Sequence, residues 1–134
     1  MPKVCKVLIV EDDGEIRNVL ADTLAGPGYH FTLTATGAEM RAALASDPEI
    51  DIAVIDVVLP GGSHGIALAQ EVAAQGLPVI LTSGDHRRAE AIAKSGHRYI
   101  MKPFRITSLL ELIDSVLQAT EAKCERPACG RPAG

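Results

Sequence analysis

The sequence is poor in aromatic residues and has no tryptophan. Two tyrosines and two phenylalanines are its only aromatic residues, although 47% of the 134 residues are hydrophobic. A hydrophobic core must therefore be built from Ala, Val, Ile and Leu. The length is that of one ordinary domain and is too short for two domains with full cores.

Long hydrophobic runs, an excess of basic charge and paired cysteines are also lacking. No apolar run approaches the roughly 20 residues of a membrane span, and early charges at Lys3 and Lys6 argue against a secretory signal. A net charge of −4 does not favour nucleic acid as a partner. The odd count of three cysteines indicates free thiols in a reducing compartment. We therefore expect a cytoplasmic protein without membrane or nucleic-acid contacts.

Short β-branched runs alternate with longer amphipathic runs, which predicts an α/β fold. The expected strands are residues 4–10, about 29–35, 52–57, 78–82 and 98–101. The expected helices are one through Ile16 and Leu24, then about 38–45, 66–75, 86–94 and 106–119. Continuous apolar strands are typical of a parallel sheet covered on both faces. We expect one domain over residues 1–120 and a disordered tail over 121–134.

Polar residues follow or end the expected strands. Glu11 and Asp12 follow the first strand, and Asp56 lies near the end of the third; Ser83 and Lys102 follow the fourth and fifth. Ligands of an open parallel sheet bind beyond the carboxyl ends of its strands. Crowded carboxylates raise each other's pKa, and a hard cation such as Mg²⁺ relieves that repulsion. With a lysine nearby, the pattern favours a site for a phosphoryl group, which a carboxylate can accept as nucleophile.

Three other interpretations of these residues fit the sequence less well. Acidic residues favour helix N-termini, so Glu11, Asp12 and Asp13 can be caps, and Asp13 fits that role best. A dinucleotide site of similar topology needs a G-x-G-x-x-G run after the first strand, which the acidic run replaces. A phosphatase with an aspartate nucleophile usually has a second acid two residues later, where this chain has Val58.

Four segments resemble the motifs of receiver domains of two-component response regulators. They are residues 7–13, 51–61, 78–84 and 99–104, in order within a match over about residues 4–119. The resemblance implies the flavodoxin-like receiver fold, a five-stranded parallel sheet in the strand order 2-1-3-4-5 with five helices. The loop that follows Asp56 is one residue longer than the commonest form, which leaves the start of the third helix open.

The same resemblance assigns roles to individual residues. Asp56 is implied to be the phosphoacceptor, and Glu11, Asp12 and Asp56 to bind Mg²⁺ or Mn²⁺. The other residues with implied roles are Val58 (metal, through its backbone carbonyl), Ser83 and Lys102 (phosphoryl group), Ser83 and Tyr99 (conformational switch) and Pro103 (after a cis peptide).

The function that the resemblance implies is that of a regulatory phosphoacceptor rather than an enzyme. A sensor histidine kinase or a histidine phosphotransfer protein would donate the phosphoryl group to Asp56. The surface of the fourth helix, fifth strand and fifth helix would then change and contact a downstream protein target. We expect a stand-alone receiver, unless the chain is part of a hybrid protein. The alternative is a degenerate receiver that binds partners without phosphorylation, and a homodimer stays open.

Overall fold

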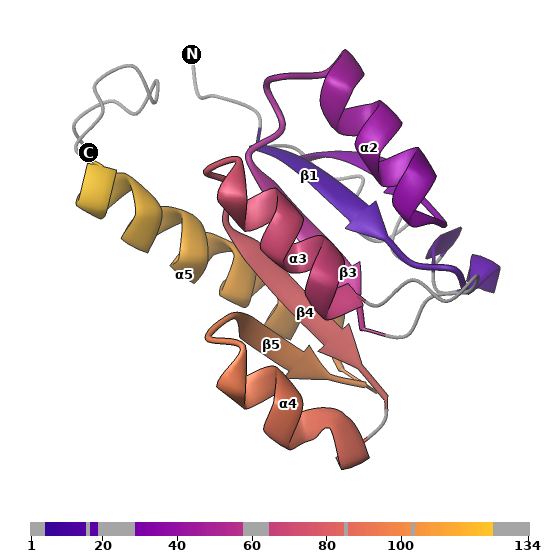
Figure 1. Cartoon of the computed structure of the whole chain (residues 1–134). Helices are drawn as coiled ribbons and strands as arrows, with labels where there is room; N and C mark the ends of the chain where they lie inside the picture. The colour runs from indigo at the N-terminus through magenta and orange to yellow at the C-terminus, as the bar shows by residue number, and fades with distance from the viewer. Residues whose placement is uncertain are drawn as a thin grey trace.

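The computed structural model describes residues 5–15, 17–18, 29–57, 65–84, 86–102 and 104–124. In this part of the chain, the strands form one parallel sheet in the order β2-β1-β3-β4-β5 (Figure 1). They are β1 (Cys5–Val10), β2 (Tyr29–Thr34), β3 (Ile52–Asp56), β4 (Val79–Ser83) and β5 (Arg98–Met101). This sheet confirms the predicted fold class and strand order.

The helices cover the two faces of the sheet. They are α2 (Gly37–Ser46), α3 (Gly65–Ala74), the 3-10 helix η1 (His86–Arg88), α4 (Ala89–Lys94) and α5 (Ile106–Cys124). Figure 1 shows α2 and α3 in front of the sheet and α5 behind it. The described part of the expected first helix is limited to Gly14, Glu15, Arg17 and Asn18, which are helical.

Two helices differ from the sequence-based expectation. The fourth expected helix is divided into the 3-10 turn η1 and the short helix α4. The fifth helix continues to Cys124 instead of ending near residue 119. Residues 125–134 of the expected tail lie outside the described residues.

Strand alternation divides the core between the two faces, because successive side chains of a strand point to opposite sides. Leu8, Ile55 and Leu81 belong to the cluster that packs under α2, α3 and α4. Ile9, Val54 and Ile80 belong to the cluster under α5. From α5 itself the residues Leu109, Ile113 and Val116 are buried at helical spacing. The apolar strands are therefore covered on both sides, as a parallel sheet requires.

Local signals explain where several helices begin and end. Thr36 caps α2, since its hydroxyl accepts a hydrogen bond from the Glu39 amide at 3.1 Å, and the Glu39 carboxylate accepts one from the Ala35 amide at 2.8 Å. Gly76 and Gly96, with φ of 90° and 81°, follow α3 and α4 in the left-handed conformation that glycine adopts without strain. These glycines turn the chain into β4 and β5.

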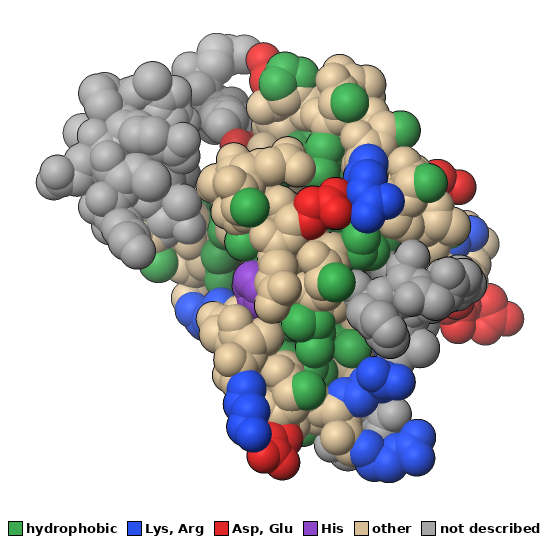
Figure 2. Space-filling model, in the orientation of Figure 1, with side chains coloured by type: hydrophobic (Ala, Val, Ile, Leu, Met, Phe, Trp, Pro, Cys, Tyr) green, Lys and Arg blue, Asp and Glu red, His purple; other side chains and the backbone are tan. Residues whose placement is uncertain are grey.

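The face shown in Figure 2 carries hydrophobic side chains scattered among polar and charged ones. Lys and Arg side chains gather at the lower right, at the end of the molecule where α4 begins in Figure 1. Among the described residues, none of the helices combines the length and the apolar character that a membrane crossing needs.

Candidate functional site

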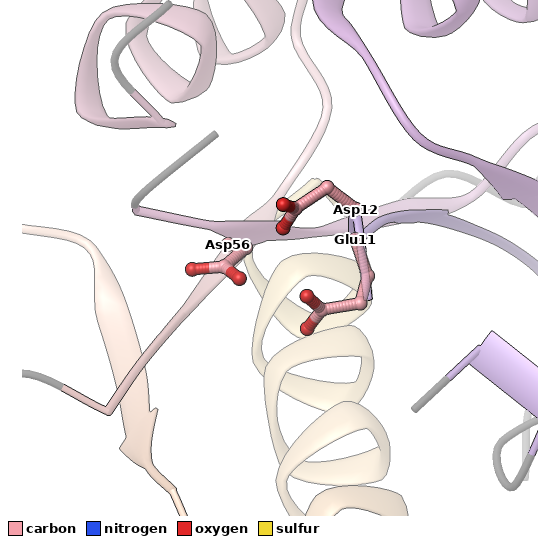
Figure 3. Close-up of side chains that lie close together, drawn as sticks. All are labelled: Glu11, Asp12 and Asp56. Carbon is pink, nitrogen blue, oxygen red and sulfur yellow. The ribbon is translucent and has the colours of Figure 1, made fainter. Parts of the chain in front are cut away.

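Three carboxylates meet at the carboxyl edge of the sheet. Strands β1 and β3 are neighbours, with Val10 opposite Ile55, so the residues that follow this pair, Glu11 and Asp56, emerge side by side. Ligand oxygens of Glu11, Asp12 and Asp56 all lie within 4.8 Å of one another. Figure 3 shows Glu11 and Asp12 extending from the end of β1 and Asp56 from β3, around a common space.

The burial of these carboxylates differs in a way that suits a metal site. Glu11 and Asp56 are buried, with 4% and 6% of their surface exposed, and Asp12 is exposed. A hard divalent cation binds carboxylate oxygens and retains water molecules on its open side. Two buried oxygens and one exposed oxygen donor could therefore hold Mg²⁺ at the surface of the sheet edge.

Lys102 binds both buried carboxylates. Its ammonium nitrogen lies 2.7 Å from Glu11 Oε1 and 2.9 Å from Asp56 Oδ2. The lysine backbone is held at the end of β5, where its amide donates to the Ser83 carbonyl at 2.8 Å. Strand β4 separates β5 from β3, so only a long side chain can reach from Lys102 to Asp56.

The electrostatics of this cluster follow from burial and proximity. Desolvation, together with a hydrogen bond to Asp56, raises the pKa of Glu11 from its ordinary value of 4.5 to about 7, against the opposing effect of Lys102. Burial alone would lower the pKa of Lys102, but its hydrogen bonds to Glu11 and Asp56 raise it overall. The lysine is therefore charged, and without a cation Glu11 holds a proton for part of the time near neutral pH.

The backbone around Glu11 is anchored to β2 and to the following turn. The Glu11 amide donates to the Thr34 carbonyl at 2.9 Å, and the buried Thr34 hydroxyl donates to the Ile9 carbonyl at 2.7 Å. The Asp13 carboxylate accepts a hydrogen bond from the Glu15 amide at 2.9 Å, which is the capping contact expected of Asp13. These bonds hold the acidic segment at the end of β1.

Arg17 is a residue that sequence reasoning missed. Its guanidinium donates to the backbone carbonyl of Glu11 at 2.8 Å, and its amide donates to the Asp13 carbonyl at 3.0 Å. Arg17 is the only Lys or Arg between residues 7 and 40, and it stands about one helical turn after the acidic run. That isolated position was the available signal for a contact with the segment that carries Glu11 and Asp12.

Comparison with known proteins decides the family. Residues 7–114 match the family model of the response regulator receiver domain. The chain belongs to the response regulator receiver family. Receiver domains are regulatory phosphoacceptor modules that bind Mg²⁺ at an acidic pocket and interact with histidine kinases or phosphotransfer proteins, and the acidic group of Glu11, Asp12 and Asp56 fits such a pocket.

Related proteins and solved structures agree with this assignment. The DNA-binding transcriptional regulator NtrC of Escherichia coli (strain K12) is 33% identical over 116 residues, which cover 83% of this chain and 24% of NtrC. The response regulator protein FleR of Pseudomonas aeruginosa is 31% identical over 112 residues, covering 81% of this chain and 24% of FleR. This chain therefore spans about a quarter of the length of these relatives.

Two solved structures resemble the whole receiver fold. A CheY-like response regulator receiver domain protein from Methanospirillum hungatei has a TM-score of 0.78 and 27% identity, covering 90% of this chain and 99% of that one. NtrX from Brucella abortus, solved in complex with ATP, has a TM-score of 0.82 and 26% identity, covering 92% of this chain and 29% of that one. Both support the receiver fold.

Of the remaining residues predicted for the receiver site, some lie within the described part of the chain and others do not. Ser83 ends β4 at the same sheet edge, one residue after Thr82, which pairs with Asp56, and its side chain is buried. Val58 and Pro103 lie outside the described residues. The carbonyl ligand and the cis peptide therefore stay predictions.

Tyr99 is the one large hydrophobic residue that is exposed among the described residues, with 42% of its surface accessible. It pairs with Leu81 across β4 and β5, and Leu81 belongs to the cluster under α3 and α4. Neighbours in register point to the same face of a sheet. Tyr99 is therefore on the α4 side of β5, and its role as a switch stays a prediction.

Proposed function

We propose that this receiver domain accepts a phosphoryl group on Asp56 from a phosphohistidine of a partner kinase or phosphotransfer protein, with Mg²⁺ or Mn²⁺. One observation carries the proposal. Glu11, Asp12 and Asp56 meet within 4.8 Å of one another, while the Lys102 ammonium lies 2.9 Å from Asp56. Phosphoryl transfer asks a protein mainly for positioning and for compensation of negative charge. This group of residues supplies both.

The acidic residues fit a divalent cation. Carboxylate oxygens are the ligands that Mg²⁺ prefers, and we assign Glu11, Asp12 and Asp56 to it, with the Val58 carbonyl as a further expected ligand. When bound, the cation supplies neutralisation of the charge on the phosphoryl group. The raised pKa of Glu11 supports this assignment, because a buried carboxylate that holds a proton is a carboxylate that lacks full compensation.

The chemistry of the proposed transfer needs one nucleophile and one charged partner. A carboxylate oxygen of Asp56 forms a bond to phosphorus, and the bond between phosphorus and the imidazole nitrogen of the partner histidine breaks, so an acyl phosphate and a histidine result. The contact of Lys102 with Asp56 supports the assignment of its ammonium as the partner of the new phosphoryl oxygens. We assign the Ser83 hydroxyl to a hydrogen bond with one of those oxygens.

The proposed output is a change of the surface formed by α4, β5 and α5. Ser83 is buried and Tyr99 is exposed, so a shift of Ser83 toward a phosphoryl oxygen would leave room into which Tyr99 can rotate. Such a switch is an equilibrium between two conformations that one new charge biases. The altered surface would contact a downstream protein or take part in a phosphorelay.

Intact mass spectrometry tests the chemistry. The protein is incubated with a small-molecule phosphodonor and Mg²⁺, and we expect the addition of one phosphoryl group, lost in Asp56→Asn and on chelation of the metal. Asp114→Asn is the matched control, because Asp114 is an exposed aspartate of α5 that contacts Tyr29 instead of the acidic cluster. An unmodified wild-type protein would favour the degenerate receiver that acts without phosphorylation.

A further inference from the structure

Helix α3 begins against the peptide that follows Asp56. Gly65 is the first residue of α3 and is buried, and its amide donates to the Val57 carbonyl at 2.8 Å. A Cβ atom at position 65 would overlap the carbonyl oxygen of Asp56, and it would lie 2.5 Å from Val57 Cα and 2.7 Å from the Asp56 carbonyl carbon. All three are backbone atoms, so a side-chain rotation cannot relieve the overlap.

The peptide after Asp56 is held from two sides. On the sheet side, the Val57 amide donates to the Thr82 carbonyl of β4 at 2.9 Å. On the helix side, Gly65 occupies the space next to the same peptide. Strand β3 ends at Asp56, so the contacts from β4 and α3 fix the peptide that follows the strand.

Helix α3 cannot move away from this contact without losing its own packing. Leu68, Ala69 and Val72 of α3 are buried in the core cluster that packs between the sheet and helices α2, α3 and α4. Interiors are packed densely, so a shift of the helix by a few tenths of an ångström disturbs many contacts. A side chain added at Gly65 would therefore displace the end of β3 as well as the helix.

We propose that Gly65 is a positioning residue for Asp56. The absence of a side chain lets α3 start directly against the Asp56–Val57 peptide, and this contact sets the direction in which the Asp56 carboxylate leaves β3. The inference rests on the proposed phosphoacceptor function. Errors of about 1 Å in the placement of a reacting group can cost on the order of a hundredfold in rate. The 2.9 Å contact with Lys102 depends on the same placement.

The chain offers a matched control at Gly37. This glycine is the first residue of α2, lies on the same face of the sheet and is also buried. A Cβ atom there would meet the side-chain carbons of Leu68 at 3.1 and 3.3 Å and the Arg41 guanidinium at 3.8 Å. Side chains can yield by small rotations, so Gly37→Ala tests the cost of filling space next to a helix start without moving Asp56.

The experiment compares wild type, Gly65→Ala and Gly37→Ala in two measurements. Urea unfolding gives the stability of each protein, and phosphorylation by a small-molecule phosphodonor is followed over a range of Mg²⁺ concentrations. The second measurement separates the rate at saturating Mg²⁺ from the Mg²⁺ concentration that gives half of that rate. A residue with a merely structural role changes the folded fraction but not the saturated rate of the folded protein.

We expect the saturated rate of Gly65→Ala to fall by about tenfold or more, and that of Gly37→Ala to stay within about twofold of wild type. A folded Gly65→Ala protein with the wild-type saturated rate would overturn the positioning role and leave the proposed function intact. A wild-type protein that accepts no phosphoryl group would instead overturn the proposed function, and the positioning role with it.

A measurement on the wild-type protein covers the case in which Gly65→Ala does not fold. Coupling between two positions is reciprocal, so if Gly65 positions Asp56, a group bound at Asp56 stabilises the contact at Gly65 in return. We expect hydrogen exchange of the Gly65 amide to slow when Mg²⁺ and beryllofluoride, a phosphoryl mimic, are added, with a smaller change at Gly37. An unchanged Gly65 amide would contradict the coupling.

Discussion

The ammonium nitrogen of Lys102 lies 2.9 Å from Oδ2 of Asp56, although 46 positions of the chain separate the two residues. The contact exists because Lys102 continues the β4–β5 ladder and its long side chain crosses the end of β4. The same ammonium also binds Glu11. Lys102 therefore compensates the acidic cluster in the absence of a metal, and it opposes the binding of a second positive charge there.

Replacement of Lys102 by Ala should separate these two effects. Without a cation, the folded state would keep two buried carboxylates with no ammonium partner, which we expect to cost about 3 kcal/mol of unfolding free energy. Mg²⁺ should bind about tenfold more tightly, since a repelling charge is gone, and tenfold corresponds to about 1.4 kcal/mol. Urea unfolding and calorimetric titration with Mg²⁺ measure the two quantities at a pH well above 7, because removal of Lys102 also removes an effect that lowers the pKa of Glu11.

The control for this variant is Lys94→Ala. Lys94 forms an exposed pair with Glu90 at 3.1 Å within α4, and exposed pairs of this kind contribute about 0.5 kcal/mol or less. We expect no change in Mg²⁺ affinity for Lys94→Ala. An unchanged Mg²⁺ affinity in Lys102→Ala as well would mean that the lysine and the metal do not share one site.

Glu11 should make the stability of the metal-free protein depend on pH. Burial, with a hydrogen bond to Asp56, raises its pKa from 4.5 to about 7, so between these values the folded state binds more protons than the unfolded state. Stability is then highest at low pH within this window and falls as the pH rises from about 4.5 to about 7. The part due to Glu11 is on the order of 3 kcal/mol at most.

Urea midpoints measured across this window for wild type and Glu11→Gln test the assignment, because Gln cannot titrate. The free energy of unfolding of the wild type minus that of Glu11→Gln should decrease from low to neutral pH and level off above pH 7. Mg²⁺ affinity of the wild type should weaken as the pH drops below about 7, since a proton competes for Glu11. Parallel pH profiles of the two proteins would refute the raised pKa.

Arg17 should support the metal site from behind the acidic segment. Its guanidinium donates to the Glu11 carbonyl at 2.8 Å, and groups that orient metal ligands typically change affinity by about 10–100-fold when removed. We expect Arg17→Ala to weaken Mg²⁺ binding by about tenfold, measured by calorimetric titration. Arg41→Ala is the control, because Arg41 pairs with Glu71 between α2 and α3 at 2.8 Å. Equal Mg²⁺ affinities of the two variants would argue against a role for Arg17.

Tyrosine fluorescence can report the proposed switch, because the chain has no tryptophan and only two tyrosines. In Tyr29→Phe the fluorescence comes from Tyr99 alone, which is 42% exposed. Phosphorylation of Asp56 should bury Tyr99 and reduce quenching by acrylamide roughly twofold or more, because a buried ring is shielded from collisions. Asp56→Asn in the same background should show no such change. Quenching that stays constant on phosphorylation would contradict the rotation of Tyr99.

Local patterns in the sequence were sufficient to predict the order of the strands and helices along the chain. Apolar runs of strand length and the helical spacing of Leu109, Ile113 and Val116 report burial directly, because side chains repeat every two residues in a strand and every 3.6 in a helix. Helix ends were predicted less well. The start of α4 forms a 3-10 turn, and α5 continues to Cys124, because helix ends depend on packing beyond the local pattern.

The sequence by itself determined that acids, a hydroxyl and a lysine follow or end parallel strands, since strand ends are visible in the hydrophobic pattern. Which strands are neighbours decides which of these groups meet, and only the folded sheet brings Lys102 across β4 to Glu11 and Asp56. The hydrogen bond from Arg17 to the Glu11 carbonyl and the contact of Gly65 with the Asp56 peptide were also decided by the tertiary structure. Such contacts depend on distances between backbones, and a linear pattern carries no information about those distances.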